Sequence, residues 1–343
     1  MVKVGILGVG FMGTAHFRAY TGYRKAKVVA LCDLNPKRLK GDWSDIAGNI
    51  EGAGASGADI RKLHLHADPA DLFADPDVEV VDITLPTFLH AEYAVAALEA
   101  GKHVVCEKPM AVSLRECDKM IAAADRADRR LFIAHCIRFW PEFVALKEII
   151  DGGTYGKVLA ASFWRKSSTP AWSWDNWLMD EARSGGAVVD LHIHDTDYIN
   201  SVFGVPKSVR SVGVVGAVSN SAVDSLVTEY LYDNGPQISA EGTWALAPTF
   251  GFTHGFCVTL EGATVEHDAK SETRLTVHTA DGKTRTPRVG QRDGYEAELR
   301  HFVDCVAAGK DSEVVTAQAA RDALKVTLAE ARAVKTGRTV PIR

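Results

Sequence analysis

A glycine-rich turn between an apolar run and a helical pattern is the feature that most restricts the fold. Gly8, Gly10 and Gly13 form the pattern G-x-G-x-x-G directly after the apolar run 4–7, and residues 14–20 continue with helical periodicity. In a strand–turn–helix unit, the first glycine makes the tight turn, the second lets the backbone approach a pyrophosphate, and the third allows close helix packing. The N–H groups that begin the helix then attract the phosphates. The pattern therefore predicts a dinucleotide-binding unit.

An acidic residue stands where such a unit recognises the adenosine ribose. Asp33 ends the apolar run 27–32, 20 residues after Gly13. A carboxylate at this place accepts the ribose hydroxyls of NAD and repels the 2′-phosphate of NADP. Asp33 could instead only cap a turn. We expect NAD, while the nearby Lys37 and Arg38 leave the use of NADP open.

Two domains are expected, because 343 residues exceed what one hydrophobic core usually serves. Residues 1–135 alternate short apolar runs with helical patterns, which is typical of a doubly wound parallel sheet of the Rossmann type. Residues 136–343 contain short strand patterns with hairpin turns at 233–235 and 281–282, which predict antiparallel pairing. We also expect a helix opening at Asn35-Pro36, a surface insertion at 41–57 and two closing helices.

Charge and cysteine usage exclude several classes of partner. The formal net charge is −5 and no stretch is strongly basic, so we expect no nucleic acid partner. No apolar run approaches the length of a membrane span, and the N-terminal residues lack the pattern of a secretory signal. The six cysteines are scattered without a Cys-x-x-Cys pair, which favours buried thiols in the cytoplasm over disulfides or a zinc site.

A lysine follows a later strand of the first domain. Glu107-Lys108-Pro109 closes the apolar run 103–106, and proline disfavours helical geometry at the residue before it. Open α/β sheets bind their ligands at the carboxyl ends of their strands. We therefore expect Lys108 to lie where cofactor and substrate meet.

The segment 185–195, with the sequence GGAVVDLHIHD, carries the acid–base candidates of the second domain. If it is helical, Asp190 and His194 share a face at a spacing of i and i+4, and His192 points elsewhere. If it is a strand, Asp190, His192 and His194 share a face and suggest a zinc site. Histidines that serve only packing at a helix start are a third interpretation.

Together these motifs resemble the Gfo/Idh/MocA family of oxidoreductases over nearly the whole chain. The motifs, in order, are Gly8 to Gly13, Thr84-Leu85-Pro86-Thr87 with His90, Glu107-Lys108-Pro109, and the glycine pair followed by Asp190 and His194. The resemblance implies a Rossmann domain followed by an α/β domain built on a large, open, mostly antiparallel sheet that commonly mediates oligomerisation. It implies hydride transfer between a nicotinamide and a secondary alcohol of a sugar or cyclitol. No metal is implied.

The resemblance also assigns residues to roles. Lys108, Asp190 and His194 match the catalytic lysine, aspartate and histidine of the family. The expected cofactor contacts are Gly8, Gly10, Phe11, Met12, Gly13, Asp33, Thr84, Pro86, His90, Glu107 and Lys108. The expected substrate contacts are Lys108, Arg138, Trp174, His192 and His194. Imidazole, with an ordinary pKa of about 6.5, favours His194 as the base, with Lys108 stabilising developing negative charge.

Some features depart from the family or leave alternatives open. His192 stands where the family often has glycine, so its role is either substrate contact or packing. Four tryptophans, Trp164, Trp172, Trp174 and Trp177, could line a carbohydrate site or anchor a core or interface. Three other functions remain: an enzyme that retains NAD (epimerase, sugar–sugar oxidoreductase or glycosidase), a nucleotide-binding sensor without chemistry, and a metal hydrolase. We expect a homo-oligomer that acts on a small polyol.

Overall fold

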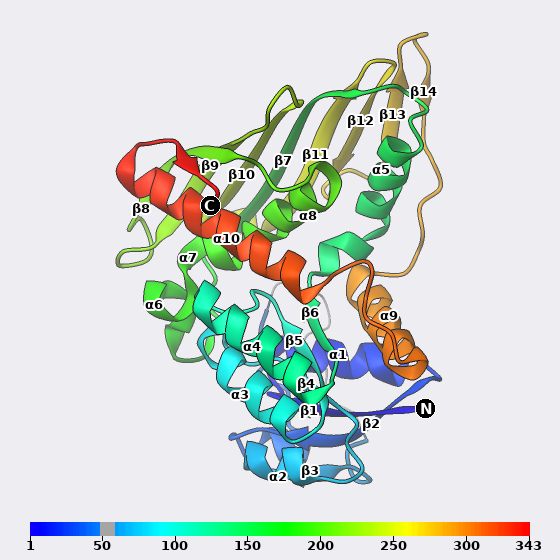
Figure 1. The fold of residues 1–343 in the computed structure, drawn as a ribbon, viewed down its shortest axis with the longest axis vertical. Coiled ribbons are helices and arrows are strands. Elements are labelled where there is room, and N and C mark those ends of the chain that lie inside the picture. The colour runs from blue at the N-terminus through cyan, green and yellow to red at the C-terminus, as the bar shows by residue number, and fades with distance from the viewer. Residues whose placement is uncertain (49–58) are drawn as a thin grey trace. The chain divides into compact units, whose positions relative to one another are not determined.

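The computed structural model describes residues 1–48 and 59–343, which form two compact units (Figure 1). The first unit comprises residues 1–136 and 295–321, and the second comprises residues 137–294 and 322–343. We expected one division near residue 135, but the segment 295–321 packs within the first unit. Most of the insertion expected at 41–57 lies outside the described residues.

The first unit is built on a six-stranded parallel sheet in the order β3-β2-β1-β4-β5-β6. Its strands are β1 (Val2–Leu7), β2 (Ala26–Cys32), β3 (His64–His66), β4 (Val80–Ile83), β5 (His103–Glu107) and β6 (Leu131–Ala134). Nearly every residue of β4, β5 and β6 is buried, because helices cover both faces of such a sheet. The predicted Rossmann fold is confirmed.

The helices of the first unit are α1 (Phe11–Thr21), α2 (Pro69–Ala74), α3 (Thr87–Glu99), α4 (Leu114–Ala127) and α9 (Gly294–Ala308). The side chain of Ser113 caps α4 by accepting the Glu116 amide, and its hydroxyl donates to the Glu116 carboxylate at 2.9 Å. Helix α9 stacks Phe302 on Phe132 of β6 with ring centroids 4.9 Å apart. This stacking explains why a segment so late in the chain belongs to the first unit.

One predicted helix is wrong. The segment after Asn35-Pro36 forms only a short 3-10 turn, η1 (Arg38–Lys40). The Asn35 side chain accepts the Lys37 amide at 3.0 Å, and the turn ends at Gly41, whose φ of 78° is left-handed. Local side-chain hydrogen bonding and glycine therefore end the helical conformation after one turn.

The second unit is built on a nine-stranded sheet in the order β14-β13-β12-β11-β7-β10-β9-β8-β15, in which only the β7–β10 pair is parallel. Its strands are β7 (Val158–Ser168), β8 (Ser208–Val215), β9 (Val223–Leu231), β10 (Gln237–Leu246), β11 (Phe252–Leu260), β12 (Ala263–Asp268), β13 (Thr276–Thr279), β14 (Thr284–Arg285) and β15 (Val340–Pro341). Asn234 and Gly282 adopt φ of 54° and 80° in the two predicted hairpin turns. The mostly antiparallel sheet is confirmed.

The helices of the second unit are α5 (Pro141–Asp151), α6 (Glu181–Ser184), α7 (Gly186–Asp190) and α8 (Ile193–Phe203), with the 3-10 turns η2 (Cys136–Phe139), η3 (Trp174–Met179) and η4 (Pro248–Phe250). Helix α10 (Ala317–Thr336) begins in the first unit and continues into the second. Helix α7 packs on β9 and β10, and α8 packs on β7. None of the helices in the described residues is long and apolar enough to cross a membrane.

The glycine pair 185–186 allows the close approach of α7 to the sheet. Gly185 and Gly186 adopt φ of 78° and 76°, a region that L side chains rarely occupy. A Cβ built on Gly186 would lie 2.5 Å from the Cβ of Ala222, next to β9. Both backbone geometry and packing therefore require glycine where α7 begins.

Candidate active site

The glycine-rich loop is shaped by close backbone contacts within the first unit. Gly8 adopts φ of 95°, and a Cβ on Gly13 would collide with the carbonyl oxygen of Gly8. The hydroxyl of Thr84, directly after β4, donates to the same oxygen at 2.6 Å. Thr84 thus fixes the loop from the neighbouring strand end.

The start of α1 fits a dinucleotide pyrophosphate. Among the described residues, no side chain caps this helix at Gly10, and no heavy atom lies within 4 Å of a Cβ built there. Phe11 and Met12, the first residues of α1, are partly exposed. A helix N-terminus without a side-chain cap, beside a glycine that leaves space for a ligand, is suited to bind an anion.

Asp33 lies directly after β2 and faces the same loop. Its Oδ2 accepts the Val9 amide at 2.7 Å, and its Oδ1 accepts the Asn35 amide at 2.7 Å. The carboxylate remains partly exposed, so it retains acceptor capacity for ribose hydroxyls. Arg38, which could bind the 2′-phosphate of NADP, instead forms an ion pair with Asp45. These contacts favour NAD over NADP.

His90 holds two strand-end loops together. Its Nε2 lies 2.8 Å from the carbonyl oxygen of Leu85, and its Nδ1 lies 2.8 Å from that of Pro109. The ring is buried, and burial lowers the pKa of His90. Pro86 begins α3 in the same loop. The geometry favours a positioning role for His90, because its ring nitrogens face protein carbonyls.

A buried charge network supports the residue before the lysine. His16 Nδ1 lies 2.8 Å from Asp82 Oδ2, and its Nε2 lies 3.2 Å from Glu107 Oε1. Burial disfavours the charged imidazole, but Asp82 and Glu107 outweigh it and raise the pKa of His16 well above the ordinary value. Burial also opposes ionisation of Glu107, but His16 lowers the pKa of that carboxyl.

This network reaches the candidate catalytic lysine through the backbone. Glu107 Oε2 accepts the amide hydrogen of Lys108 at 3.0 Å, and the peptide bond between Lys108 and Pro109 is cis. Lys108 is partly exposed directly after β5. The anionic Glu107, held by His16, therefore fixes the main chain from which the lysine extends.

In the second unit the segment 185–195 is helical, so the strand interpretation is wrong. Asp190 ends α7, His194 lies in the first turn of α8, and Leu191 and His192 between them keep right-handed helical dihedrals. At this spacing Asp190 and His194 lie on one helical face, and both are partly exposed. The zinc interpretation required the strand face that these residues do not form.

His192 points into the core of the second unit. It is fully buried, and its Nε2 lies 3.1 Å from the Tyr230 hydroxyl and 3.4 Å from Glu330 Oε2. Burial lowers the pKa of His192 to about 3, and burial raises the pKa of Glu330 to about 8. Both groups are therefore neutral at pH 7, and their approach is not an ion pair. These contacts favour packing over the expected substrate contact for His192.

Two buried ion pairs hold α8 in the second unit. Arg165 of β7 binds Asp195 with both its Nε and a terminal nitrogen, at 2.9 and 3.1 Å. Arg138 binds Asp197 in the same way, at 2.7 and 2.6 Å. Arg138, expected to contact substrate, therefore uses its guanidinium to hold α8.

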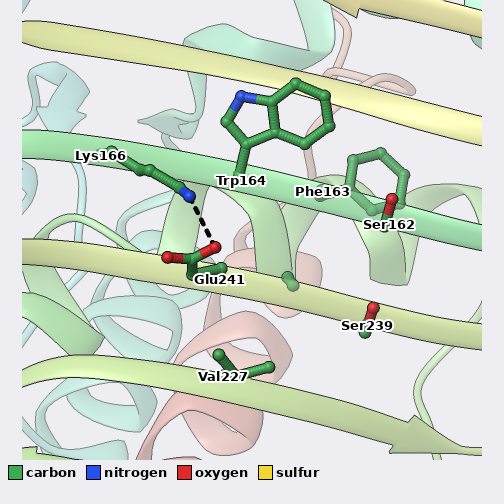
Figure 2. A pocket seen from close by; sticks show the side chains of 8 residues that line it. Ser162, Phe163, Trp164, Lys166, Val227, Ser239 and Glu241 are labelled. Atoms are coloured by element: carbon green, nitrogen blue, oxygen red, sulfur yellow. Dashed lines mark ion pairs between the residues drawn. The ribbon is translucent and has the colours of Figure 1, made fainter.

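The four tryptophans do not form one cluster. Trp164 alternates with Arg165 along β7, so it lies on the sheet face opposite α8, in a pocket with Lys166 and Glu241 (Figure 2). Trp177 packs against a buried cluster that contains Trp244. Trp174 is 66% exposed, and its ring lies 5.7 Å from the Arg183 guanidinium. Trp174 is thus the tryptophan best exposed to meet a ligand.

Sequence reasoning missed the supporting residues His16, Asp82, Tyr230 and Glu330. Asp82 did carry a signal, because it is a charged residue inside an otherwise apolar buried strand. His16 and Glu330 occupy ordinary helical positions, and their partners are distant in sequence. Only the tertiary structure brings them together.

Each of the two units matches a known protein family. A family model described as an oxidoreductase family with an NAD-binding Rossmann fold matches residues 2–135, and the model of the GFO/IDH/MocA C-terminal domain matches residues 143–285. Inositol 2-dehydrogenase of Salmonella typhimurium is 28% identical over 336 residues, covering 90% of this chain and 87% of the relative. Myo-inositol 2-dehydrogenase of Thermotoga maritima is 30% identical over 218 residues, covering 63% and 59%.

Solved structures share the fold along the whole chain. A probable dehydrogenase from Thermotoga maritima has a TM-score of 0.81 at 25% identity, with 99% of both chains covered. Levoglucosan dehydrogenase, in a complex with NADH and levoglucosan, has a TM-score of 0.83 at 23% identity, again with 99% of both chains covered.

Replacing Asp33 with asparagine should weaken NADH binding more than NADPH binding. Loss of charge-assisted hydrogen bonds of about 1.5–3 kcal/mol corresponds to roughly 10–100-fold weaker binding of NADH. Titrations of both dinucleotides by calorimetry measure the two affinities, and Asp125→Asn on α4 is the matched control. Equal affinities of the wild-type protein for NADH and NADPH would contradict the assignment.

Replacing Glu330 with glutamine should remove a pH dependence of stability. The pKa of Glu330 is raised from its ordinary 4.5 to about 8, so its stabilising contribution is complete below pH 4.5 and is lost as pH rises to 8. Glutamine does not ionise. The difference in unfolding free energy between Glu330→Gln and the wild type should therefore shift in favour of the variant as pH rises from 5 to 8. The shift should be up to about 1.4 kcal/mol per pH unit. Denaturant titrations at several pH values measure the unfolding free energies of the wild type, Glu330→Gln and the exposed control Glu272→Gln. The same pH dependence in all three proteins would contradict the prediction.

Proposed function

Because the chain belongs to the Gfo/Idh/MocA family of NAD-binding oxidoreductases, we propose that it catalyses reversible hydride transfer between NAD and a secondary alcohol of a cyclitol or sugar. The observation that carries the proposal is the shared helical face of Asp190 and His194, which places a carboxylate and an imidazole one turn apart. A non-catalytic nucleotide sensor has no need of this pair.

Lys108, Asp190 and His194 are the proposed catalytic set. Bound NAD would supply the acceptor for the hydride of the carbinol carbon. His194 takes the hydroxyl proton as general base, because imidazole exchanges protons near neutral pH. Lys108 donates a hydrogen bond to the same oxygen and stabilises its developing negative charge. Asp190 orients His194 or accepts a hydrogen bond from a neighbouring substrate hydroxyl.

All of the proposed cofactor contacts lie in the first unit. The glycine-rich loop and the start of α1 bind the pyrophosphate, and Asp33 binds the adenosine ribose. Thr84, Pro86 and His90 shape the loops at the strand ends. Asp33 and the engagement of Arg38 by Asp45 support selectivity for NAD.

The substrate class is supported by the relatives. Those named inositol 2-dehydrogenase align with most of this chain. A polyol needs several hydrogen-bonding groups around it, and we propose that Trp174 supplies an apolar face for its ring carbons. We further propose that His192 and Arg138 support α8 rather than contact the polyol, because both are engaged inside the second unit.

Lys108→Ala should retain NADH binding and lose at least about 100-fold in kcat, because the loss falls on the transition state. A panel of inositols and sugars, assayed for NADH fluorescence, gives the rates, and NADH titration checks the fold of the nucleotide site. Lys119→Ala, an exposed lysine on α4, is the matched control. Wild-type turnover by Lys108→Ala would contradict the proposed role.

The same panel separates the alternatives. NAD that co-purifies with the protein and survives dialysis, with substrate converted but no net NADH formed, would indicate an enzyme that retains its cofactor. Nucleotide binding without conversion of any polyol would favour a sensor.

We also propose that the chain forms a homo-oligomer through the open face of the nine-stranded sheet. Val212, Val214 and Val227 point to this face and are 68%, 52% and 46% exposed. The pocket around Trp164 lies on the same face, where Lys166 and Glu241 form an ion pair of 2.7 Å (Figure 2). An apolar strip with polar surroundings is typical of protein interfaces.

Val227→Glu should shift the assembly toward monomer, because it buries an unpaired charge in the interface. Light scattering coupled to size-exclusion chromatography measures the mass, with Val144→Glu on α5 as the control. A wild-type monomer, or an oligomer that Val227→Glu leaves intact, would contradict the proposal.

The cytoplasm is the proposed location. All six cysteines lie in the described residues, and none is in a disulfide. Burial raises the pKa of Cys32 and of Cys117 to about 12, which keeps these thiols protonated and unreactive. Buried, unpaired thiols suit a reducing compartment.

A further inference from the structure

The edge of the Rossmann sheet carries a cluster that the proposed reaction does not use. His64 and His66 lie two residues apart on β3, so they project from the same face of the strand. Asp75, directly after α2, reaches the same point. His64 Nδ1 lies 2.6 Å from Asp75 Oδ2, and His66 Nε2 lies 3.1 Å from the same oxygen.

We propose that His64, His66 and Asp75 form a binding site for a divalent transition-metal ion, with zinc as the best match. One ligand atom from each residue lies within 4.8 Å of the other two. Metal–ligand bonds of about 2.0–2.2 Å in a tetrahedron separate neighbouring ligand atoms by about 3.3 Å. The approach of His66 to Asp75 already matches this spacing. His64, whose side chain is 50% exposed, has room to move outward.

The donor set selects the class of ion. Two imidazoles and one carboxylate suit zinc and its neighbours cobalt and nickel, whereas magnesium and calcium prefer oxygen ligands. The exposure of His64 leaves a fourth position to water. Three protein ligands and one water is a stable arrangement for zinc.

The surroundings support the ligands as they do in metal sites. The amide of Asp77 donates to Asp75 Oδ1 at 2.9 Å, so Oδ2 is the oxygen turned to the histidines. Asp77 Oδ1 pairs with the Lys3 ammonium at 2.5 Å, and Asp77 Oδ2 lies 4.0 Å from His64 Nε2, the ring nitrogen that would not bind the ion. At this distance Asp77 makes no hydrogen bond to His64 and adds only a nearby negative charge. Lys102 is nearby, but its ammonium donates to the carbonyl oxygens of Asp75 and Val78.

The charge of the cluster is also suitable. Burial opposes ionisation of Asp75, but hydrogen bonds from His64, the Asp77 amide and His66 lower the pKa of Asp75 to about 2. The carboxylate is therefore anionic at neutral pH and ready to bind a cation. The same contacts also satisfy the three side chains by hydrogen bonding alone, so the experiment distinguishes a metal site from a hydrogen-bonded cluster.

The ion would fasten the edge strand to the chain that follows α2. β3 is the outermost strand of the sheet and has only three residues, paired to β2 along one side. Asp75 lies nine residues beyond His66, so the metal would close a short loop. We expect zinc to stabilise the first unit without being needed for hydride transfer.

Calorimetric titration of the untagged, chelator-treated protein with zinc chloride tests the proposal. We expect one zinc ion per chain, and affinity at least about 10-fold weaker in His64→Ala and in His66→Ala. At a zinc concentration 100-fold above Kd, the melting temperature of the wild type should rise by at least about 3 °C. Binding should weaken from pH 7.5 to 5.5, because ligation requires the unprotonated imidazole.

His278→Ala is the matched control, because His278 is an exposed histidine that contacts a single carboxylate, Glu266, at 3.0 Å. It should bind zinc as the wild type does. Circular dichroism confirms that each variant is folded. Absence of zinc binding, or equal binding by wild type, His64→Ala and His66→Ala, would show that the cluster is only hydrogen-bonded and would overturn the proposal.

Discussion

The bidentate ion pair between Arg165 and Asp195 is the interaction on which the second unit's candidate site depends. Both side chains are buried, so an unpaired partner would leave a charge in the core at a cost of about 3–5 kcal/mol. The pair fixes the rotation of α8 about its own axis. Asp195 points to the sheet, and the preceding residue His194 remains partly exposed although its neighbours in α8 are buried. The ion pair therefore holds the helix whose first turn carries His194.

Buried polar groups also restrain the candidate site of the first unit. His16 of α1 pairs with the Glu107 carboxylate, which accepts the backbone amide of Lys108. His90 is buried between the carbonyl oxygens of Leu85 and Pro109 and donates its ring N–H to one of them. Each candidate catalytic side chain therefore extends from a main chain that buried polar groups restrain. Such restraint limits the reorganisation that catalysis would otherwise require.

Local patterns predicted much of this molecule. The glycine loop, Asp33, the strand 131–134 and the helix 114–127 lie where their residues indicate, since turn chemistry and capping act over a few positions. The family resemblance is confirmed as well. The roles of Lys108, Asp190 and His194 stay predictions, because motif order alone does not establish chemistry.

The rest depended on contacts distant in sequence. Arg138 and His192 carry polar groups that suit a substrate, and only the partners Asp197 and Tyr230 show that they face inward. The strand β3 has three residues and two histidines, so it shows no apolar alternation. Its place at the sheet edge follows from pairing with β2, which no local pattern encodes.

A crystal structure with NADH and an inositol or sugar that the enzyme converts tests the account most directly. We expect one substrate hydroxyl within about 3.2 Å of both the Lys108 ammonium and a His194 ring nitrogen. We also expect the carbon bearing this hydroxyl to face the nicotinamide. A ligand whose reacting hydroxyl contacts neither Lys108 nor His194 would contradict the proposed catalytic set.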